Sequence, residues 1–184
     1  MKTSLMLAAF AMLISGAGLA QEHPGNVVRS PNSGHAWLEQ EVRHQLLNVP
    51  WYSIFDDLEF QVTGDNEVTL LGATANPALK KDAEDAVKHI EGVTKVEDKI
   101  ELLPVSPMDQ QIRRAEYRAI YREPALEKYA LGSVPPIHII VKNAHVQLVG
   151  WVASAQDKQI AGARAMSVGS VFAVENDLKV ENGR

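Results

Sequence analysis

Cysteine is absent from all 184 residues of this chain. Its absence excludes disulfide bonds, zinc sites with thiolate ligands and dithiol redox chemistry. It also excludes a lipid anchor on a cysteine after the N-terminal apolar run. Small exported domains often depend on disulfides, so this chain must obtain its stability from hydrophobic cores alone.

Long apolar segments are also scarce. The longest run, Leu5 to Ile14, is too short to cross a hydrocarbon layer of about 30 Å. It follows Lys2 and is followed by Gly18 and Ala20, an order typical of a secretory signal peptide. We therefore expect residues 1–20 to be a signal peptide cleaved after Ala20, and the mature protein to be periplasmic.

Motifs that carry catalysis are missing too. The sequence contains no nucleophile elbow, no HExxH motif and no glycine-rich phosphate loop. The six histidines are scattered, and His138 and His145 are expected on the exposed face of one hairpin without converging on a metal. Asp56 and Asp57 are adjacent, so their carboxyl groups should point apart, as in a turn. We therefore expect no enzyme activity, no cofactor and no metal site.

Charge is distributed unevenly along the chain. Without residues 1–20, the chain has 17 basic and 23 acidic residues, a net charge of −6. Residues 36–104 carry 14 acidic and 6 basic side chains, whereas residues 109–180 carry 7 acidic and 9 basic ones. A nucleic-acid partner is not expected, because a strong basic excess is missing from this exported chain.

A duplicated segment determines the architecture. The residues from Val68 to Leu102 recur from Val146 to Val180 at a constant offset of 78, without a gap. Four aligned pairs illustrate the match: Val68 and Val146, Gly72 and Gly150, Val96 and Val174, and Ile100 and Leu178. A repeat this long indicates a duplicated domain, because each copy is large enough to form its own core.

In the first copy, the apolar pattern predicts five elements. A helix from about His35 to Leu47 is followed by strands at residues 58–62 and 68–71. A second helix begins at Asn76-Pro77, where proline in the first turn loses no hydrogen bond. A last strand leads through Ile100.

The second copy repeats this order. Ser106 is a candidate cap for a helix that runs to about Arg122. The strand at residues 137–141 is followed by a two-residue turn at Asn143-Ala144. This turn predicts two cross-strand pairs: Ile139 with Leu148, and Ile140 with Gln147.

Only one face of each predicted hairpin is apolar, so both helices of a copy should cover that face. We therefore expect an α+β fold of two tandem α-β-β-α-β domains, each a small mixed three-stranded sheet with two helices on one face. The expected boundaries are a signal peptide at 1–20, a flexible arm at 21–34, a first domain at 35–104, a linker at 105–108 and a second domain at 109–181.

This element order and its V-x-L-x-G and Val-x-x-x-(Ile/Leu) steps resemble the BON domain. The matching residues of the first copy are Val68, Leu70, Gly72, Ala83, Gly92, Val93, Val96 and Ile100; those of the second are Val146, Leu148, Gly150, Ala161, Val171, Val174, Asn176 and Leu178. Two copies behind a signal peptide are similar to the exported family that includes the hyperosmotically inducible periplasmic protein. The resemblance implies attachment to phospholipid membranes and a role in envelope maintenance or osmotic stress.

Two positions depart from the family pattern. Ser170 stands where the pattern has a helix-ending glycine, with Gly169 one position earlier. Ala144 stands in the hairpin turn where glycine is usual. These departures concern the geometry of two turns and leave the expected fold unchanged.

The helix after Ser106 carries the main candidate binding site. Cations and interfacial aromatics on one helix suit anionic lipid headgroups. The candidate lipid-binding residues are Arg113, Arg114, Tyr117, Arg118, Tyr121 and Arg122. The alternative is an ordinary solvated helix face, with its arginines paired to Asp109, Glu116 and Glu123.

A second candidate is the aromatic loop after the first helix. Trp51, Tyr52 and Phe55 lie close together in the sequence and could form a protein-binding surface. The same residues could instead close the end of the first core, because exposed aromatic rings are costly. The predicted partners are thus an anionic phospholipid surface or, alternatively, envelope proteins.

Overall fold

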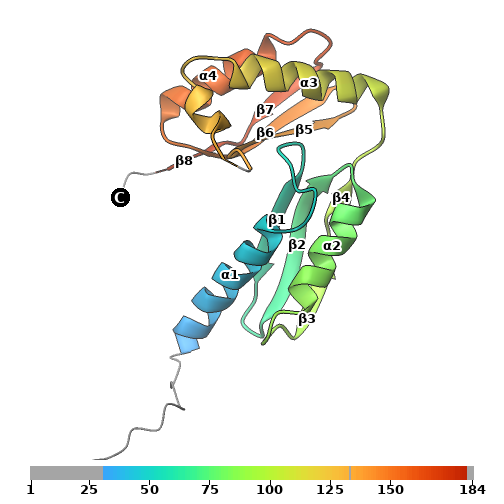
Figure 1. The fold of residues 1–184 in the computed structure, drawn as a ribbon, viewed down its shortest axis with the longest axis vertical. Helices are drawn as coiled ribbons and strands as arrows, with labels where there is room; N and C mark the ends of the chain where they lie inside the picture. The colour runs from blue at the N-terminus through green and yellow to red at the C-terminus, as the bar shows by residue number, and fades with distance from the viewer. Residues whose placement is uncertain (1–30, 133, 182–184) are drawn as a thin grey trace, which may run out of the picture.

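The computed structural model describes residues 31–132 and 134–181, so the expected signal peptide and most of the flexible arm lie outside the described residues. It contains two α+β domains, one above the other in the view of Figure 1. The first comprises α1 (Pro31–Leu47), β1 (Asp57–Val62), β2 (Glu67–Thr74), α2 (Pro77–Lys88), β3 (Lys95–Asp98) and β4 (Glu101–Leu102). The second comprises α3 (Pro107–Tyr121), the 3-10 helix η1 (Glu127–Ala130), β5 (Ile137–Lys142), β6 (His145–Val152), α4 (Ala155–Met166), β7 (Ala173–Asn176) and β8 (Lys179–Val180).

The two domains have the same sheet topology. In the first, β2 lies in the centre, antiparallel to β1 and parallel to β3 and β4. In the second, β6 takes the central place between β5 and β7, and also pairs with β8. Ile139 lies opposite Leu148 and Ile140 opposite Gln147. The predicted register of the second hairpin is therefore confirmed.

Two helices cover one face of each sheet (Figure 1). In the first domain, the core is formed by apolar side chains of α1, α2 and the strands, among them Leu38, Val42, Val68, Leu79 and Ile100. The second core includes Ile112, Ile139, Leu148, Ala161 and Leu178. The predicted fold class is thus confirmed, and α1 begins at Pro31, four residues before the expected start.

The last strand of each domain is interrupted, which the sequence did not predict. In the first domain, the side chain of Asp98 accepts a hydrogen bond of 2.9 Å from the backbone N–H of Ile100. The side chain of Asn176 occupies the same place before Leu178. A side chain that competes for a backbone donor breaks the ladder locally. Each sheet therefore has four short strands in place of the expected three.

The predicted turns and caps agree with the structure. Asn76 caps α2 and Ser106 caps α3, each through its side-chain oxygen. Asn143 and Ala144 both have positive φ, 51° and 62°, as a tight two-residue hairpin requires. Ser170 has φ 70°, the left-handed conformation that Gly92 has in the first domain.

The two domains contact each other through the loop between α1 and β1. Ile54 belongs to this loop by sequence, but its side chain is buried in the core of the second domain. Its carbonyl oxygen accepts a hydrogen bond of 2.7 Å from the N–H of Ile139, at the edge of β5. Phe55 packs against the same core. The loop of the first domain therefore completes the core of the second.

A smaller apolar cluster joins the domains at the uncovered face of the second sheet. Ala73 and Leu103 of the first domain pack there against Ile140 and Val149. Two exposed ion pairs cross the same boundary, Lys142 with Glu101 and Lys179 with Glu59. Exposed ion pairs contribute little, so the apolar contacts and the buried loop hold the domains together.

Among the residues that the structure describes, no helix combines the length and the apolar character needed to cross a bilayer.

Candidate functional site

The start of α3 is fixed by two polar contacts. The hydroxyl of Ser106 accepts a hydrogen bond from the N–H of Asp109. The carboxylate of Asp109 in turn accepts hydrogen bonds from the N–H groups of Asn143 and Ala144, at 3.0 and 2.9 Å. The first turn of α3 is thus tied to the turn between β5 and β6. This anchoring fixes which face of α3 points outward.

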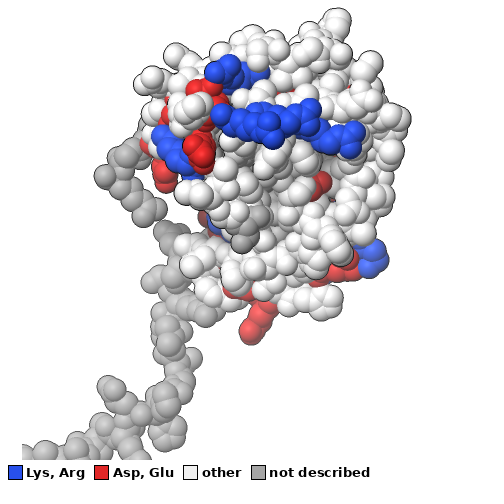
Figure 2. All heavy atoms as spheres, turned by 45° about the horizontal axis from the view of Figure 1, so that its top comes forward, with Lys and Arg blue, Asp and Glu red and all other residues white. Residues whose placement is uncertain are grey.

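The outward face of α3 is basic. Arg114, Arg118 and Arg122 follow one another at four-residue spacing and are all exposed. Figure 2 shows a band of basic side chains across the helical face of the second domain, with acidic side chains gathered at one end of the band. We call these three residues the arginine face.

The acidic side chains of α3 and its end do not neutralise the arginine face. Asp109 binds the hairpin turn, and Glu116 is completely buried. Glu123 forms a salt bridge with Arg164 of α4. Within the described part of the chain, no salt bridge involves Arg114, Arg118 or Arg122. The expected pairing of these arginines with Asp109, Glu116 and Glu123 is therefore wrong for the described residues, whereas their exposure to solvent agrees with an ordinary solvated helix face.

Arg113 was expected to flank the lipid-binding stripe, but the structure places it inside the domain. Its side chain is 1% exposed, and one guanidinium nitrogen donates a hydrogen bond of 2.7 Å to the carbonyl oxygen of Val141. Burial lowers the pKa of Arg113, opposed by the charges of Asp109 and Asp56. The prediction for Arg113 is wrong, because its outward rotation would leave that carbonyl without its donor.

Tyr121 is also inside, and its predicted role at the membrane is wrong. Its hydroxyl donates a hydrogen bond of 2.5 Å to the carbonyl oxygen of Ile137, and burial raises the pKa of this phenol. Tyr117 remains at the surface, 45% exposed, with its ring centroid 5.2 Å from that of Tyr121. The exposed part of the predicted set is therefore Arg114, Tyr117, Arg118 and Arg122.

Glu116 occupies an unusual place on the inward face of α3. Its side chain is fully buried, and neither carboxylate oxygen has a hydrogen-bond partner among the described residues. Burial raises the pKa of Glu116 to about 8, because an isolated carboxylate is poorly solvated there. The side chain is therefore mostly neutral at pH 7, and it adds no charge to the arginine face.

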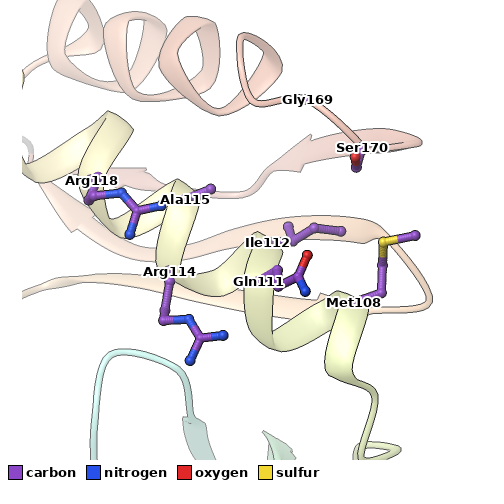
Figure 3. Close-up of a pocket in the computed structure, with 8 residues that line it drawn as sticks. All are labelled: Met108, Gln111, Ile112, Arg114, Ala115, Arg118, Gly169 and Ser170. Atoms are coloured by element: carbon purple, nitrogen blue, oxygen red, sulfur yellow. The ribbon is translucent and has the colours of Figure 1, made fainter.

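A groove lies beside the arginine face, between α3 and the turn after α4. It has a volume of about 320 Å³. Its lining combines apolar side chains of α3 with polar ones, as Figure 3 shows: Met108, Gln111, Ile112, Arg114, Ala115, Arg118, Gly169 and Ser170. In this view Met108 and Ser170 lie at the same end of the groove. The groove thus places guanidinium groups next to an apolar surface.

Sequence reasoning did not assign Met108, Gln111 or Ser170 to a site. Met108 lies in the first turn of the helix that Ser106 caps, and Ser170 departs from the glycine pattern, but neither feature by itself indicates a binding surface. The signal that could have found them is the repeat itself. It places residues 169–170 at the end of α4, and α4 must pack beside α3 on the same face of the sheet.

The aromatic loop serves mainly as an internal contact. Tyr52 packs against the first core and stacks on His138 of the second domain, with ring centroids 5.4 Å apart. Phe55 packs on the second core. Trp51 alone is strongly exposed, at 78%, with a positive φ of 70°. The predicted alternative site therefore keeps one accessible aromatic residue.

His138 and Asp56 meet in the interface between the domains. His138 was expected to be exposed but is 9% exposed, because the first domain covers this part of the sheet. The carboxylate of Asp56 accepts hydrogen bonds from the hydroxyl groups of Ser53 and Thr74, both at 2.6 Å, and shapes the turn before β1. Across residues 31–132 and 134–181, no cluster of three potential metal ligands is present.

Comparison with known proteins matches the BON domain at residues 35–104 and again at residues 122–182. No curated protein matches this chain. The similar solved structures include two of CdsD, a structural protein of the Type III secretion system of Chlamydia trachomatis. The C-terminal domain of CdsD has 12% identity and a TM-score of 0.32, with 78% of this chain and 97% of that chain covered. The second has 12% identity and a TM-score of 0.30, with 79% and 93% covered.

The second BON match begins at the end of α3, which itself packs against β5 and α4. Both matches fall on copies of the same sheet topology. Because the two matched ranges together cover more than half of the chain, the chain belongs to the BON domain family, with two BON domains in tandem.

Proposed function

We propose that this protein is a non-enzymatic periplasmic protein that associates peripherally with anionic phospholipid membranes through the arginine face of α3. The observation that carries the proposal is the exposure of Arg114, Arg118 and Arg122 without salt bridges among the described residues, while the nearby acids are engaged elsewhere. Membership of the BON family supports it. A role in envelope maintenance or osmotic stress would follow from such attachment.

The charges favour this orientation of the protein on a membrane. Residues 36–104 have a net charge of −8, and residues 109–180 a net charge of +2. An anionic surface would therefore repel the first domain and attract the second. Tyr117, exposed beside the arginine face, adds a ring suited to the headgroup region.

The arginine face alone gives weak binding. Each arginine near an anionic surface contributes roughly 1 kcal/mol, so three arginines contribute about 3 kcal/mol. This corresponds to a dissociation constant above about 1 mM. Additional apolar contacts, or several molecules on one surface, would have to strengthen the attachment.

Co-sedimentation with vesicles tests the proposal. The mature protein is expected to sediment with vesicles that contain phosphatidylglycerol and not with pure phosphatidylcholine vesicles. The variant Arg114→Glu, Arg118→Glu, Arg122→Glu should lose this binding. Equal binding to both vesicle types, or unchanged binding of the variant, would contradict the proposal.

A charge-matched control variant separates the arginine face from net charge. Replacing Lys81, Lys88 and Lys99 of the first domain by glutamate changes the net charge by the same amount, at exposed positions of the other domain. This variant should bind nearly as the wild type does. An equal loss in both variants would show that only total charge matters.

One observation favours a second candidate, a protein-binding role. Trp51 is 78% exposed and has a backbone conformation that bulky residues rarely adopt. Binding of an envelope protein through this ring would be lost in Trp51→Ala, while vesicle binding would be unchanged. Pull-down from envelope extracts with the wild-type protein and with Trp51→Ala distinguishes protein binding from lipid attachment.

A further inference from the structure

Among the exposed apolar side chains of the second domain, two lie close to the turn between β5 and β6. Phe172, just before β7, is 80% exposed, and Met108, in the first turn of α3, is 53% exposed. A large apolar side chain this exposed leaves most of its apolar surface in contact with water, which is unfavourable. Such exposure marks a surface that meets an apolar partner when several residues share it.

Both residues flank the same hairpin turn. The N–H of Phe172 donates a hydrogen bond of 2.8 Å to the carbonyl oxygen of Ala144. On the other side, Asp109, the neighbour of Met108, accepts a hydrogen bond from the N–H of Ala144. The ring of His145 lies 4.9 Å from that of Phe172 and supports it from the sheet side. We call Met108 and Phe172 the apolar tip.

The apolar tip continues into the groove beside the arginine face. Met108 lines this groove together with Arg114, Arg118 and Ser170, and Ser170 is two residues from Phe172 (Figure 3). Apolar and cationic side chains thus follow one another over a short distance on one side of the domain. This sequence of groups matches a lipid monolayer, in which phosphates lie next to the hydrocarbon boundary.

We propose that the apolar tip inserts into the acyl-chain boundary of a membrane while the arginine face holds the lipid phosphates. This inference rests on the proposed function. It adds that the apolar tip is the inserted element and that α3 is tilted, with its first turn deepest in the membrane. The occupant of the tip is the hydrocarbon of a lipid monolayer. A lipid fits this surface better than a purely apolar protein partner does, because the apolar tip continues into unpaired guanidinium groups. A purely apolar protein would leave these groups without counter-charges.

A single fluorescent label tests insertion directly. Because the chain has no cysteine, Phe172→Cys gives one site for an environment-sensitive NBD group. Leu131→Cys is the matched control, since Leu131 is 79% exposed but follows η1, whose Tyr129 binds the start of α4 rather than its end. With phosphatidylglycerol vesicles, the label at position 172 should show a blue shift and a several-fold rise in intensity. The control label should show neither.

Quenching distinguishes insertion from contact with headgroups. Spin labels on the acyl chains should quench the label at position 172 more strongly than spin labels on the headgroups. A bound protein whose labels at positions 172 and 131 respond alike, or whose label at position 172 is quenched best from the headgroups, would overturn the insertion.

Substitution of the two residues of the apolar tip supplies an independent measurement that needs no fluorescent label. The double variant Met108→Ser, Phe172→Ser is expected to lower partitioning onto phosphatidylglycerol vesicles by about tenfold or more. Its urea unfolding curve should match that of the wild type, because both side chains are exposed. A correctly folded double variant that partitions as the wild type does would overturn the proposal.

The two proposals fail in different ways. If the wild-type protein does not sediment with anionic vesicles, both the proposed function and the proposed insertion of the apolar tip are contradicted. If the wild type binds, the arginine variant does not, and the tip variant binds normally, only the insertion falls. Loss of binding in both variants, with a response of the label at position 172, supports both.

Discussion

The Nδ1 atom of His138 lies 2.7 Å from the carbonyl oxygen of Asp56, so a buried hydrogen bond joins the second sheet to the loop of the first domain. The ring of Tyr52 stacks on the same imidazole. Burial lowers the pKa of His138, while its backbone contacts with Asp56 and Ser53 act in the opposite direction. The interface is therefore built around a histidine whose burial favours the neutral form.

This pKa shift predicts a loss of stability on acidification. Because the pKa of His138 is lower in the folded protein than its ordinary value of 6.5, the unfolded chain binds a proton more readily. The contribution is fully present above pH 6.5 and is lost as the pH falls, by at most about 1.4 kcal/mol per pH unit. The variant His138→Gln should lack this loss, as measured by urea unfolding between pH 7.5 and 5.

The comparison must be between the wild type and His138→Gln at each pH, because Asp57 has the opposite effect. Burial and repulsion by Glu59 raise the pKa of Asp57 to about 6, so this residue favours folding as the pH falls. The exposed His145→Gln is the control and should keep the wild-type profile. Parallel profiles of the wild type and His138→Gln would contradict the prediction.

Glu116 predicts a loss of stability at alkaline pH. Its folded pKa of about 8 lies above the ordinary 4.5, so its contribution is fully present below pH 4.5 and is lost as the pH rises through 8. Glu116→Gln keeps the shape and cannot ionise. We expect it to raise the free energy of unfolding by several kcal/mol at pH 9 and to change it little at pH 4.5.

The exposed Glu127→Gln serves as its control and should show no such pH-dependent gain. A gain for Glu116→Gln of equal size at pH 4.5 and pH 9 would argue against ionisation as its cause.

Ser170 predicts a stabilising substitution. Its φ of 70° lies in the left-handed region, which costs a residue with a Cβ roughly 1 kcal/mol. Ser170→Gly should therefore raise the free energy of unfolding by a few tenths to about 1 kcal/mol, after the entropy that glycine adds to the unfolded chain. Ser167→Gly, at a φ of −81°, is the matched control and should destabilise the protein. Thermal unfolding of both variants measures these changes in stability. If Ser167→Gly also stabilised the protein, relief of the left-handed conformation would not explain the effect of Ser170→Gly.

Ile54 predicts coupling between the domains. The change Ile54→Ala removes a side chain that belongs to the first domain by sequence and to the second core by position. We expect a loss of about 2–4 kcal/mol in the free energy of unfolding. Hydrogen exchange should show a less protected amide at Ile139, whose N–H donates to the carbonyl oxygen of Ile54.

Val62→Ala, in β1 and packed against the first core, is the control for this coupling. It should destabilise the first domain and leave the Ile139 amide protected. A normal Ile139 protection in Ile54→Ala would mean that the loop does not hold the second sheet.

Sequence patterns predicted the fold because the strongest signals are local or repeated. The apolar strand at residues 137–141 and the two-residue turn at Asn143-Ala144 are enough to predict the register of the second hairpin without any knowledge of contacts between the domains. The constant offset of 78 then predicts the same elements at corresponding positions of both copies. The interruption of the last strand near Asp98 was not predictable in the same way. It depends on a single hydrogen bond, in which the side chain of Asp98 accepts from the backbone N–H of Ile100.

The arginine face was predictable in part. Four-residue spacing placed Arg114, Arg118 and Arg122 on one side of a helix, and that side is exposed. Arg113 and Tyr121 were misplaced because their long side chains find partners on β5, which no helical pattern reveals. Ala115 of the same helix is half-buried and lines the groove beside the arginine face, which helical spacing alone did not predict.

The contact between Ile54 and Ile139 has a consequence for the history of the two copies. An edge strand with free N–H groups is a template for pairing with other chains. The first domain occupies part of this edge on β5, so the second domain released alone would have an open core and a strand ready to aggregate. Since the duplication, the second copy has thus come to depend on the first, which supplies Ile54 to its core and covers part of its edge strand.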